Sequence, residues 1–381
     1  MIYNSINKNE NIVNKKNSVQ VKNHFVDGGY IEVISPFKKN FLVEFWNGKG
    51  ECEFRTHVSS NSWARTNKKY FEEYTCKVYD NDNLVYNETY NAKGKRVYIA
   101  LDSKSLGDTL AWFPYVDEFR KKWDCEMVCS TFWNYLFEKQ YPNIKFVKPG
   151  ETVNDLYAMY TLGWYYSDDV FNYTRNPQDF KKISLQQTAT DILGLDFKHV
   201  KAKLDLPKVE KKKKVGIGLH STAQAKYWNN PTGWQQVTNY LLEHGYEPVI
   251  LSKEDSGYMG NIHPIGAKKF PAGSINDLIT EMLSCDFFMG IGSGLSWLAW
   301  TLDLPIILIS GFSTPVAEFG GDNVYRVFND NVCNGCFNRL KLDAGDWNWC
   351  PDQKGTERQF ECTKSITFKM VEEYLEKIIK K

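Results

Sequence analysis

A short segment ending in an aspartate stands between an apolar run and an amphipathic run. The segment is Ser105-Leu106-Gly107-Asp108, and we expect a strand at Val97–Leu101 before it and a helix from Asp108 to about Trp123 after it. Ligands of open α/β sheets bind beyond the carboxyl ends of the strands, so Asp108 is placed to face a substrate. Its carboxylate can take the proton from an acceptor hydroxyl that attacks a sugar carbon. The alternative is that Asp108 only caps the helix.

A lysine lies in the loop after a second apolar run. We expect a strand at Val215–Leu219, and the loop that follows it reaches Trp228 without the spacing of a phosphate-binding P-loop. Lys226 can neutralise a leaving diphosphate, and the hydroxyls of Ser221 and Thr222 can donate hydrogen bonds to phosphate oxygens. The alternative is a Lys226 side chain that is only solvated.

A glycine-rich segment closes a third expected strand and opens a helix. It reads Gly290-Ile291-Gly292-Ser293-Gly294-Leu295-Ser296-Trp297. Glycines allow a backbone to approach a ligand closely, and a helix N-terminus offers N–H groups to a diphosphate. The alternative is a tight turn whose glycines serve packing only. The candidate donor-binding residues are Gly292, Ser293, Gly294 and Leu295.

Glu254 is a further candidate at a strand end. It follows an expected strand at Glu247–Leu251, in the sequence Leu251-Ser252-Lys253-Glu254. Acidic residues in this position bind ribose hydroxyls in dinucleotide-binding folds. An ordinary polar loop residue would occupy the same position.

Four of the nine cysteines lie in one aperiodic stretch near the C-terminus. Two residues separate the first pair, so both thiolates can reach one ion, and four thiolates suit a tetrahedral site for zinc or iron. Full thiolate coordination implies a structural role, and a metal would stabilise this weakly apolar stretch directly. The alternative is four buried thiols. The cysteines are Cys333, Cys336, Cys350 and Cys362.

Alternating strand and helix patterns must hold these segments, so we predict the α/β fold class. Closely spaced β-rich runs precede the first α/β pattern, and the basic run Lys211–Lys214 separates it from the second. We read that run as a solvated linker. The predicted parts are an arm at 1–23, a β-rich domain at 24–95, a first α/β domain at 96–210, a second α/β domain at 211–330, a four-cysteine loop at 331–364 and a helix at 365–381.

Bulk composition excludes several classes of partner. The 381 residues carry 47 Lys and Arg against 46 Asp and Glu, which gives no electrostatic footprint for nucleic acid. No apolar run approaches the roughly 18 residues of a membrane span, and the first residues lack a signal-peptide core. We therefore expect a cytoplasmic protein, in which cysteines serve as metal ligands or buried thiols.

Taken together, these segments resemble the bacterial autotransporter O-heptosyltransferases, which are related to the ADP-heptose:lipopolysaccharide heptosyltransferases. The segments Ser105–Asp108, His220–Trp228 and Gly292–Ser296 occur in the family's order. The resemblance implies a GT-B type fold, in which two Rossmann-like domains face a cleft, with an N-terminal β-rich domain and a C-terminal four-cysteine metal loop. It also implies inverting transfer of heptose from ADP-heptose to serine hydroxyls of an autotransporter passenger, by a large homo-oligomer.

The resemblance implies that residues 96–210 form the acceptor-side α/β domain and residues 211–330 the nucleotide-sugar-binding α/β domain, and it assigns roles to the candidates. Asp108 would be the general base, Lys226 would hold the donor diphosphate with the segment from Gly292 to Leu295, and Glu254 would lie near the ribose. The four cysteines would hold one structural iron per chain, with zinc as the chemical alternative.

Departures from the lipopolysaccharide enzymes favour the autotransporter branch. Those enzymes usually have Asp before Thr-Gly in the third motif, where this chain has Gly292-Ser293-Gly294, and His where it has Trp297. They also place Pro directly after the Trp of the second motif, whereas Asn229 and Asn230 intervene here. Two alternatives remain: a lipopolysaccharide-core heptosyltransferase, and a non-catalytic module that binds nucleotide sugars and mediates assembly.

Overall fold

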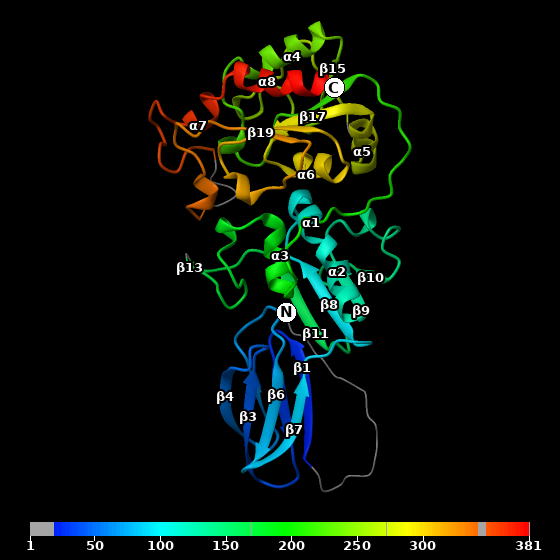
Figure 1. Ribbon diagram of the computed structural model, residues 1–381, viewed down its shortest axis with the longest axis vertical. Coiled ribbons are helices and arrows are strands. Elements are labelled where there is room, and N and C mark those ends of the chain that lie inside the picture. Colours follow the sequence, from blue (N-terminus) through cyan, green and yellow to red (C-terminus); the bar gives the residue numbers. More distant parts are fainter. Residues whose placement is uncertain (1–18, 169, 272, 342–347, 381) are drawn as a thin grey trace. The chain divides into compact units, whose positions relative to one another are not determined.

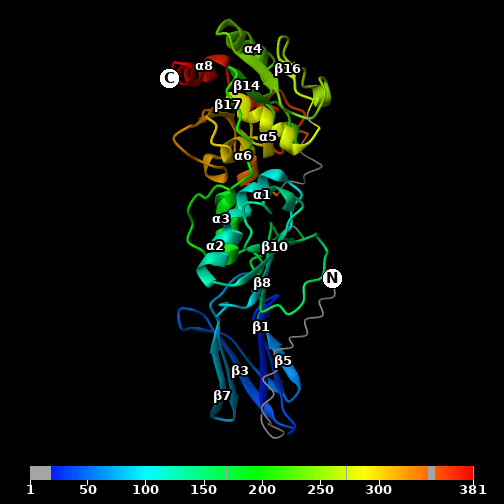
Figure 2. The ribbon, with the colours of Figure 1, turned by 90° about the vertical axis from the view of Figure 1, so that its right-hand side faces the viewer.

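The computed structural model describes residues 19–168, 170–271, 273–341 and 348–380, which form two compact units (Figures 1 and 2). The helix α1 (Leu106–Trp112) belongs to unit 2 except for its last residue. Unit 1 comprises the described residues up to Lys104, Trp112–Phe180 and Gln187–Lys198, and unit 2 comprises Ser105–Ala111, Lys181–Gln186 and the described residues from His199 onward.

The largest sheet of unit 1 combines parallel and antiparallel strands. Its first five strands run parallel to their neighbours, and the last two pairings are antiparallel. Phe25 on β1 (Gln20–Val26) pairs with Ala158 on β11 (Ala158–Leu162), so strands of the β-rich segment extend the α/β sheet. In spatial order the strands are β10 (Ile144–Val147), β9 (Glu126–Ser130), β8 (Arg96–Leu101), β11 (Ala158–Leu162), β1 (Gln20–Val26), β2 (Tyr30–Ile34) and β5 (Ser62–Arg65).

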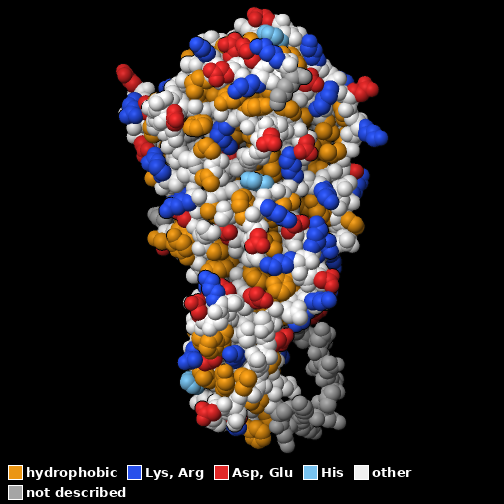
Figure 3. All heavy atoms as spheres, viewed as in Figure 1, with side chains coloured by type: hydrophobic (Ala, Val, Ile, Leu, Met, Phe, Trp, Pro, Cys, Tyr) orange, Lys and Arg blue, Asp and Glu red, His pale blue; other side chains and the backbone are white. Residues whose placement is uncertain are grey.

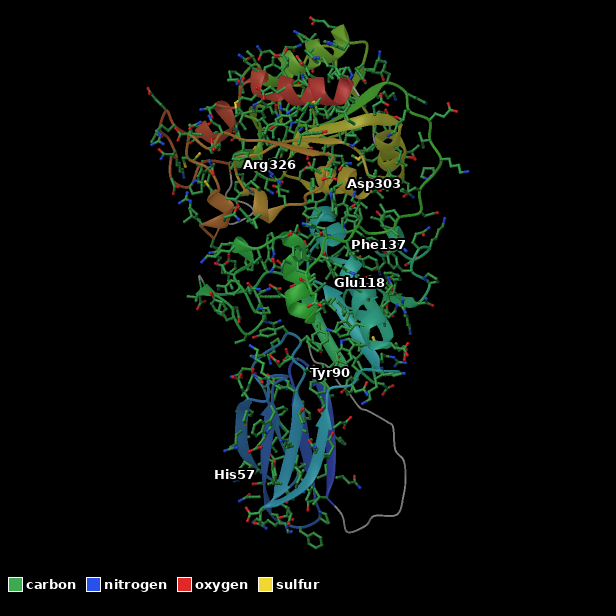
Figure 4. All side chains as sticks on the ribbon, in the orientation of Figure 1. His57, Tyr90, Glu118, Phe137, Asp303 and Arg326 are labelled. Atoms are coloured by element: carbon green, nitrogen blue, oxygen red, sulfur yellow. The ribbon has the colours of Figure 1, made fainter. Side chains whose placement is uncertain are left out.

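A second, fully antiparallel sheet completes the β-rich part of unit 1. Phe41, Val43 and Phe45 alternate along its strand β3 (Asn40–Trp46) and are completely buried, as expected for a strand with one face on a core. The ring of Tyr90 (Figure 4) packs within 5.4 Å of the rings of Phe25, Phe71, Trp123 and Tyr157. This aromatic cluster joins the β-rich segment to the α/β part. The strands are, in order, β4 (Cys52–Ser59), β3 (Asn40–Trp46), β6 (Thr75–Asp80) and β7 (Asn83–Thr89).

The first helical region of the chain departs from the sequence prediction. The helix expected from Asp108 to Trp123 is interrupted, because Pro114 has no N–H to donate and instead begins α2 (Pro114–Trp123). Residues 134–140 form the 3-10 turn η1 (Asn134–Leu136) followed by turns. Phe137, labelled in Figure 4, stacks on Phe113 with 3.8 Å between ring centroids. The remaining elements are β12 (Tyr166–Ser167), β13 (Val170–Phe171), η2 (Phe180–Lys182) and α3 (Leu185–Leu193).

Unit 2 is built on a six-stranded sheet in which every pairing is parallel. Together with the parallel strands of unit 1, this sheet confirms the predicted α/β class. In spatial order the strands are β16 (Lys268–Lys269), β15 (Glu247–Ile250), β14 (Lys214–Gly218), β17 (Cys285–Ile291), β18 (Ile306–Ile309) and β19 (Val324–Val327).

Helices cover both faces of this sheet. Figures 1 and 2 show α4 (Gly233–Glu243) and α8 (Phe368–Ile379) on one face and α5 (Ile275–Ser284) and α6 (Gly294–Thr301) on the other. Val371 and Leu375 of α8 are fully buried in the main core of unit 2, with Ile217 of β14 and Met289 of β17. None of the helices that the structure describes is both long and apolar enough to cross a membrane.

The short elements of unit 2 lie in its loops. They are η3 (Gln224–Lys226), η4 (Tyr258–Gly260), η5 (Pro315–Ala317), η6 (Cys336–Asn338) and α7 (Glu361–Lys364). The first three follow the carboxyl ends of β14, β15 and β18, which are neighbours or near neighbours in the sheet. Loops at that edge of a parallel sheet are where α/β proteins bind ligands.

Candidate active site

The first and third motifs meet at two glycines. A Cβ built on Gly107 would lie 3.3 Å from the Cα of Gly294 and 3.1 Å from Cδ1 of Trp297, and one built on Gly294 would lie 3.3 Å from the backbone nitrogen of Gly107. The start of α1 therefore approaches the start of α6 so closely that a side chain at either glycine would make an unusually tight contact. The contact brings Asp108 to the N-terminus of α6.

Ser105, rather than Asp108, caps helix α1. The hydroxyl of Ser105 accepts a hydrogen bond from the backbone N–H of Asp108 (3.4 Å), and the backbone carbonyl of Ser105 accepts one from the N–H of Thr109 (3.1 Å). Asp108 lies within the first helical turn and is half-buried. Of the two roles considered for Asp108, capping is thus taken by its neighbour Ser105.

Lys226 ends the 3-10 turn η3, with its ammonium over an aromatic ring. Its Nζ lies 5.5 Å from the centroid of the Phe312 ring. Burial lowers the pKa of the Lys226 ammonium, while the nearby carboxylates of Glu318 and Asp108 act in the opposite direction. Asp108 and Lys226 therefore belong to one electrostatic neighbourhood. A desolvated ammonium attracts an anionic ligand more strongly than one in water does.

Glu318 is a part of this site that the sequence did not suggest. Its carboxylate accepts hydrogen bonds from Arg326 Nη1 (3.0 Å) and Ser313 Oγ (2.5 Å). A Cβ built on Gly292 would lie 2.6 Å from Glu318 Oε1, so Gly292 leaves room for this carboxylate. Arg326 projects from β19 (Figure 4). The available signal was the position of Glu318 in the loop after β18, at the carboxyl edge of the sheet.

The N-terminus of α6 carries an unsatisfied hydroxyl. Ser293 is the N-cap residue, but its side chain makes no capping hydrogen bond, and its Oγ is buried without a hydrogen-bond partner among the described residues. Ser296 Oγ, by contrast, donates to the carbonyl of Ile291 (2.5 Å). Leu295 packs towards the sheet, with Cδ1 3.5 Å from a Cβ built on Gly218. A buried hydroxyl beside the positive end of a helix suits an anionic ligand.

Ser221 and Thr222 differ in their surroundings. The hydroxyl of Ser221 is engaged within its own loop, donating to the carbonyl of Ala223 (3.0 Å) and accepting from its N–H (3.3 Å). Thr222 is exposed. Thr222 can thus reach a ligand as it stands, whereas Ser221 would first exchange its loop contacts.

Glu254 lies beside a buried histidine at the end of the neighbouring strand. Its Oε2 is 4.0 Å from Nδ1 of His220. Both ring nitrogens of His220 are buried and lack a hydrogen-bond partner among the residues that the structure describes. Burial lowers the pKa of His220, which keeps the ring neutral, while Glu254 opposes that shift. Ser252 Oγ accepts from the N–H groups of Leu219 (2.9 Å) and His220 (3.1 Å), which ties the two loops together.

The cysteine segment packs against the loop that carries Lys226. Cys336 and Cys350 share a buried cluster with Phe312 and with two alanines of the η3 loop, Ala223 and Ala225. A Cβ built on Gly311 would lie 3.2 Å from Cys362 Sγ. The cysteine segment therefore packs against the η3 loop and supports it, next to the Phe312 ring that lies beneath Lys226.

The four thiols lie within electrostatic reach of one another. Burial raises the pKa of Cys336 to about 11 and that of Cys362 to about 12, and charge on the other three cysteines adds to the shift at Cys362. Cys350 Sγ accepts a hydrogen bond from the N–H of Phe360 (2.8 Å), an interaction that favours a thiolate. The donor set has the chemistry of a four-thiolate site.

No three acidic, histidine or cysteine side chains in the described part of the chain are arranged so as to hold a metal ion. Residues 342–347, which belong to the same segment, lie outside the described residues.

The curated proteins described next, which are similar to this chain in sequence, are both autotransporter heptosyltransferases. No protein-family model matches the chain. It is 37% identical over 321 residues to an autotransporter heptosyltransferase of Citrobacter rodentium named BAHTCr, covering 81% of this chain and 77% of that protein. It is 37% identical over 330 residues to the autotransporter heptosyltransferase TibC of Escherichia coli O78:H11, covering 83% and 80% respectively.

A solved structure of TibC is also similar. That structure, of an iron-containing dodecameric glycosyltransferase from enterotoxigenic Escherichia coli, superposes with a TM-score of 0.85 at 33% identity, covering 94% of this chain and 95% of TibC. A second TibC structure, in complex with ADP-D-β-D-heptose, has a TM-score of 0.85 at 32% identity, with coverage of 96% and 97%. The likeness thus extends over both units.

Proposed function

The chain belongs to the autotransporter heptosyltransferases, glycosyltransferases that use ADP-heptose, and we propose that it moves heptose from ADP-heptose to serine hydroxyls of an autotransporter passenger domain with inversion at the anomeric carbon. The observation that carries the site assignment is the joint placement of Asp108 and Lys226. One offers a carboxylate and the other a desolvated ammonium, within reach of each other's charge, and Asp108 directly follows the glycine that contacts the start of α6.

The proposed reaction is a single displacement. The serine oxygen attacks the anomeric carbon while the bond from that carbon to the β-phosphate oxygen breaks, and Asp108 accepts the serine proton. Negative charge then grows on the departing ADP. Lys226 and the N–H groups at the start of α6 stabilise that charge, with the hydroxyls of Ser293 and Thr222 as further donors.

The roles of the remaining candidates follow from their positions. Gly292 and Gly294 have no side chains, so the backbone can approach the diphosphate closely. Leu295 packs the start of α6 against the sheet. Glu254 binds the ribose, and its Oε2 lies 4.0 Å from Nδ1 of His220. We infer a GT-B arrangement for the two α/β units, supported by the likeness to TibC.

For the cysteine segment we propose one structural metal ion held by Cys333, Cys336, Cys350 and Cys362. Iron is favoured because TibC is described as iron-containing, and zinc is the chemical alternative. The metal would supply only rigidity, since four thiolates leave no open position for catalysis. Because TibC is dodecameric, we also propose a large homo-oligomer. Reduced thiols persist in the cytoplasm, which is the compartment we propose.

Intact mass spectrometry tests this function directly. The purified chain would be incubated with ADP-heptose and a purified passenger domain, in parallel with other nucleotide sugars and with a lipopolysaccharide-core acceptor. We expect the passenger to gain whole heptose units from ADP-heptose alone. Transfer to the lipid acceptor only, or no ADP release with either acceptor, would refute the proposal. Metal analysis of the same preparation distinguishes iron from zinc.

A further inference from the structure

Four loops of the candidate site follow neighbouring strands of the unit 2 sheet. Glu254 follows β15, Lys226 follows β14, the segment from Gly292 to Leu295 follows β17, and Glu318 follows β18. The strands are neighbours in the order β15-β14-β17-β18, with about 5 Å between one strand and the next. The groups proposed for the ribose and the diphosphate therefore take one side and the middle of this edge, and Glu318 lies on the other side.

The carboxylate of Glu318 is fixed from two directions. Its Oε1 accepts a hydrogen bond from Ser313 Oγ (2.5 Å), and its Oε2 accepts one from Arg326 Nη1 (3.0 Å). Arg326, labelled in Figure 4, also donates from Nη1 to Ser310 Oγ (3.0 Å), which holds the guanidinium in turn. A carboxylate held in this way loses little conformational freedom when a ligand binds to it.

Glu318 can accept further hydrogen bonds beside the glycine-rich segment. A carboxylate has about four lone-pair positions, and the bonds from Ser313 and Arg326 occupy two of them. A Cβ built on Gly292 would lie 2.6 Å from Oε1 and 3.9 Å from Oε2. Because position 292 has no side chain, the carboxylate lies directly beside the backbone of the segment proposed to hold the diphosphate.

The charge of Glu318 is balanced within the site. Arg326 carries the opposite charge at hydrogen-bond distance, so the pair is neutral and a diphosphate nearby is not strongly repelled. Figure 3 shows acidic and basic side chains interspersed over the visible face of the molecule, with no broad field of one sign there. Contacts with single groups, rather than a general field, must therefore select the ligand.

We propose that Glu318 recognises the glycosyl unit of the donor, by accepting hydrogen bonds from hydroxyl groups of the heptose. This inference rests on the proposed function. An ionised carboxylate is an acceptor only, so its ligand must supply hydrogen-bond donors, which the ionised oxygens of a diphosphate lack. The glycosyl unit has such hydroxyls and lies across the diphosphate from the ribose. The strand order places Glu318 on that side, opposite Glu254.

The test compares the affinities of the full-length protein for ADP-heptose and for ADP. E318Q keeps the size of the side chain and removes its charge. We expect the Kd for ADP-heptose to rise by about tenfold or more, whereas the Kd for ADP stays within about twofold. E243Q, at an exposed glutamate that ends α4, should match the wild type for both ligands. Titration calorimetry without an acceptor gives all these values.

A second variant removes a supporting hydrogen bond and keeps the charge pair. S313A lacks the hydroxyl that holds Oε1 and leaves the contact between Glu318 and Arg326 in place. We expect the Kd for ADP-heptose to rise by about threefold in S313A, with the Kd for ADP unchanged.

Donor analogues identify the contact itself. Each analogue of ADP-heptose would lack one hydroxyl of the heptose, and each would be titrated into the wild type and E318Q. At one position or more, loss of the hydroxyl should cost about tenfold in affinity in the wild type and less than about twofold in E318Q. A purely structural role of Glu318 would produce no such dependence on one hydroxyl.

The outcomes separate this inference from the proposed function. Equal rises in the Kd for ADP and for ADP-heptose, or no change in either, in E318Q and S313A overturn the role of Glu318. An analogue series in which every hydroxyl keeps its cost in E318Q overturns it as well, even when the wild type transfers heptose to the passenger. A wild type that binds ADP-heptose through Glu318 but transfers no heptose refutes the proposed function alone.

Discussion

The ammonium of Lys226 lies over the ring of Phe312, and Phe312 in turn shares a buried cluster with Cys336 and Cys350. The position of the proposed diphosphate ligand is thus supported by the segment proposed to bind metal. Order in the cysteine segment and affinity for the donor should therefore be coupled, although the metal takes no part in the reaction.

Substitution C350S should weaken both the fold and donor binding. We expect loss of bound metal, a fall in Tm of several degrees, and a rise of about tenfold in the Kd for ADP as the support beneath Lys226 loosens. Calorimetry, metal analysis and ADP titration give the three quantities. C129S, which alters a fully buried cysteine of β9 in unit 1, should lower Tm while leaving metal content and ADP affinity intact. Full ADP affinity in metal-free C350S would contradict the coupling.

Affinity for ADP should depend on the charge of Lys226, and it should begin to fall at a lower pH than an ordinary lysine would allow. Burial lowers the pKa of this ammonium below the ordinary lysine value of about 10.4. The positive charge is present below that lowered pKa and is lost as the pH rises through it. The Kd for ADP should therefore increase from neutral pH towards pH 10. K226R, whose guanidinium stays charged, should remove the dependence, and K226Q should bind ADP weakly at every pH. Titration calorimetry over this range would decide; identical pH profiles for the wild type and K226R would argue against the assignment.

Loss of the Asp108 carboxylate should affect turnover and not donor binding. We expect D108N to reduce kcat by a factor of about 10²–10⁴, the usual contribution of a general base, with the Kd for ADP nearly unchanged. D82N, at the exposed turn between β6 and β7, serves as the matched control. Near-normal turnover in D108N would show that another group takes the serine proton.

A methyl group at Gly292 should disturb the carboxylate of Glu318. The added Cβ would lie 2.6 Å from Glu318 Oε1, and that oxygen is held by Ser313 while its partner oxygen is held by Arg326. We expect G292A to lower the free energy of unfolding by about 1–3 kcal/mol and to weaken ADP binding. G320A, which would meet no atom within 4 Å, provides the control. Equal stability of the two variants in denaturant unfolding would mean that Glu318 moves aside without cost.

Sequence patterns located the strand ends, and with them most of the candidate site. Apolar runs predicted β8, β14 and β17. Asp108, Lys226 and the segment from Gly292 to Leu295 could therefore be assigned to the carboxyl ends of strands from the sequence alone. The packing of Gly107 on Gly294 could not be predicted from the sequence, because it joins residues far apart in the chain and leaves no periodic signal. Glu318 was missed for the same reason: its role comes from Arg326 and Ser313, which only the fold brings to it.

The β-rich segment shows a second limit of sequence patterns. Alternating residues predicted its strands, but such patterns do not reveal which strand pairs with which. Residues 24–95 were predicted as a domain of their own, a boundary that stays a prediction. By compactness they lie in unit 1 together with the first α/β strands, because β1 pairs with β11.

That pairing constrains how such a protein can be shortened or recombined. With β1 removed, β11 would become an outer strand with a row of unpaired amide and carbonyl groups, which promotes self-association of the truncated chain. We therefore expect that exchanging the β-rich segment alone would disturb the α/β sheet. Chimeras that graft it onto a smaller sugar transferase would have to carry β11, its hydrogen-bonding partner, across with it.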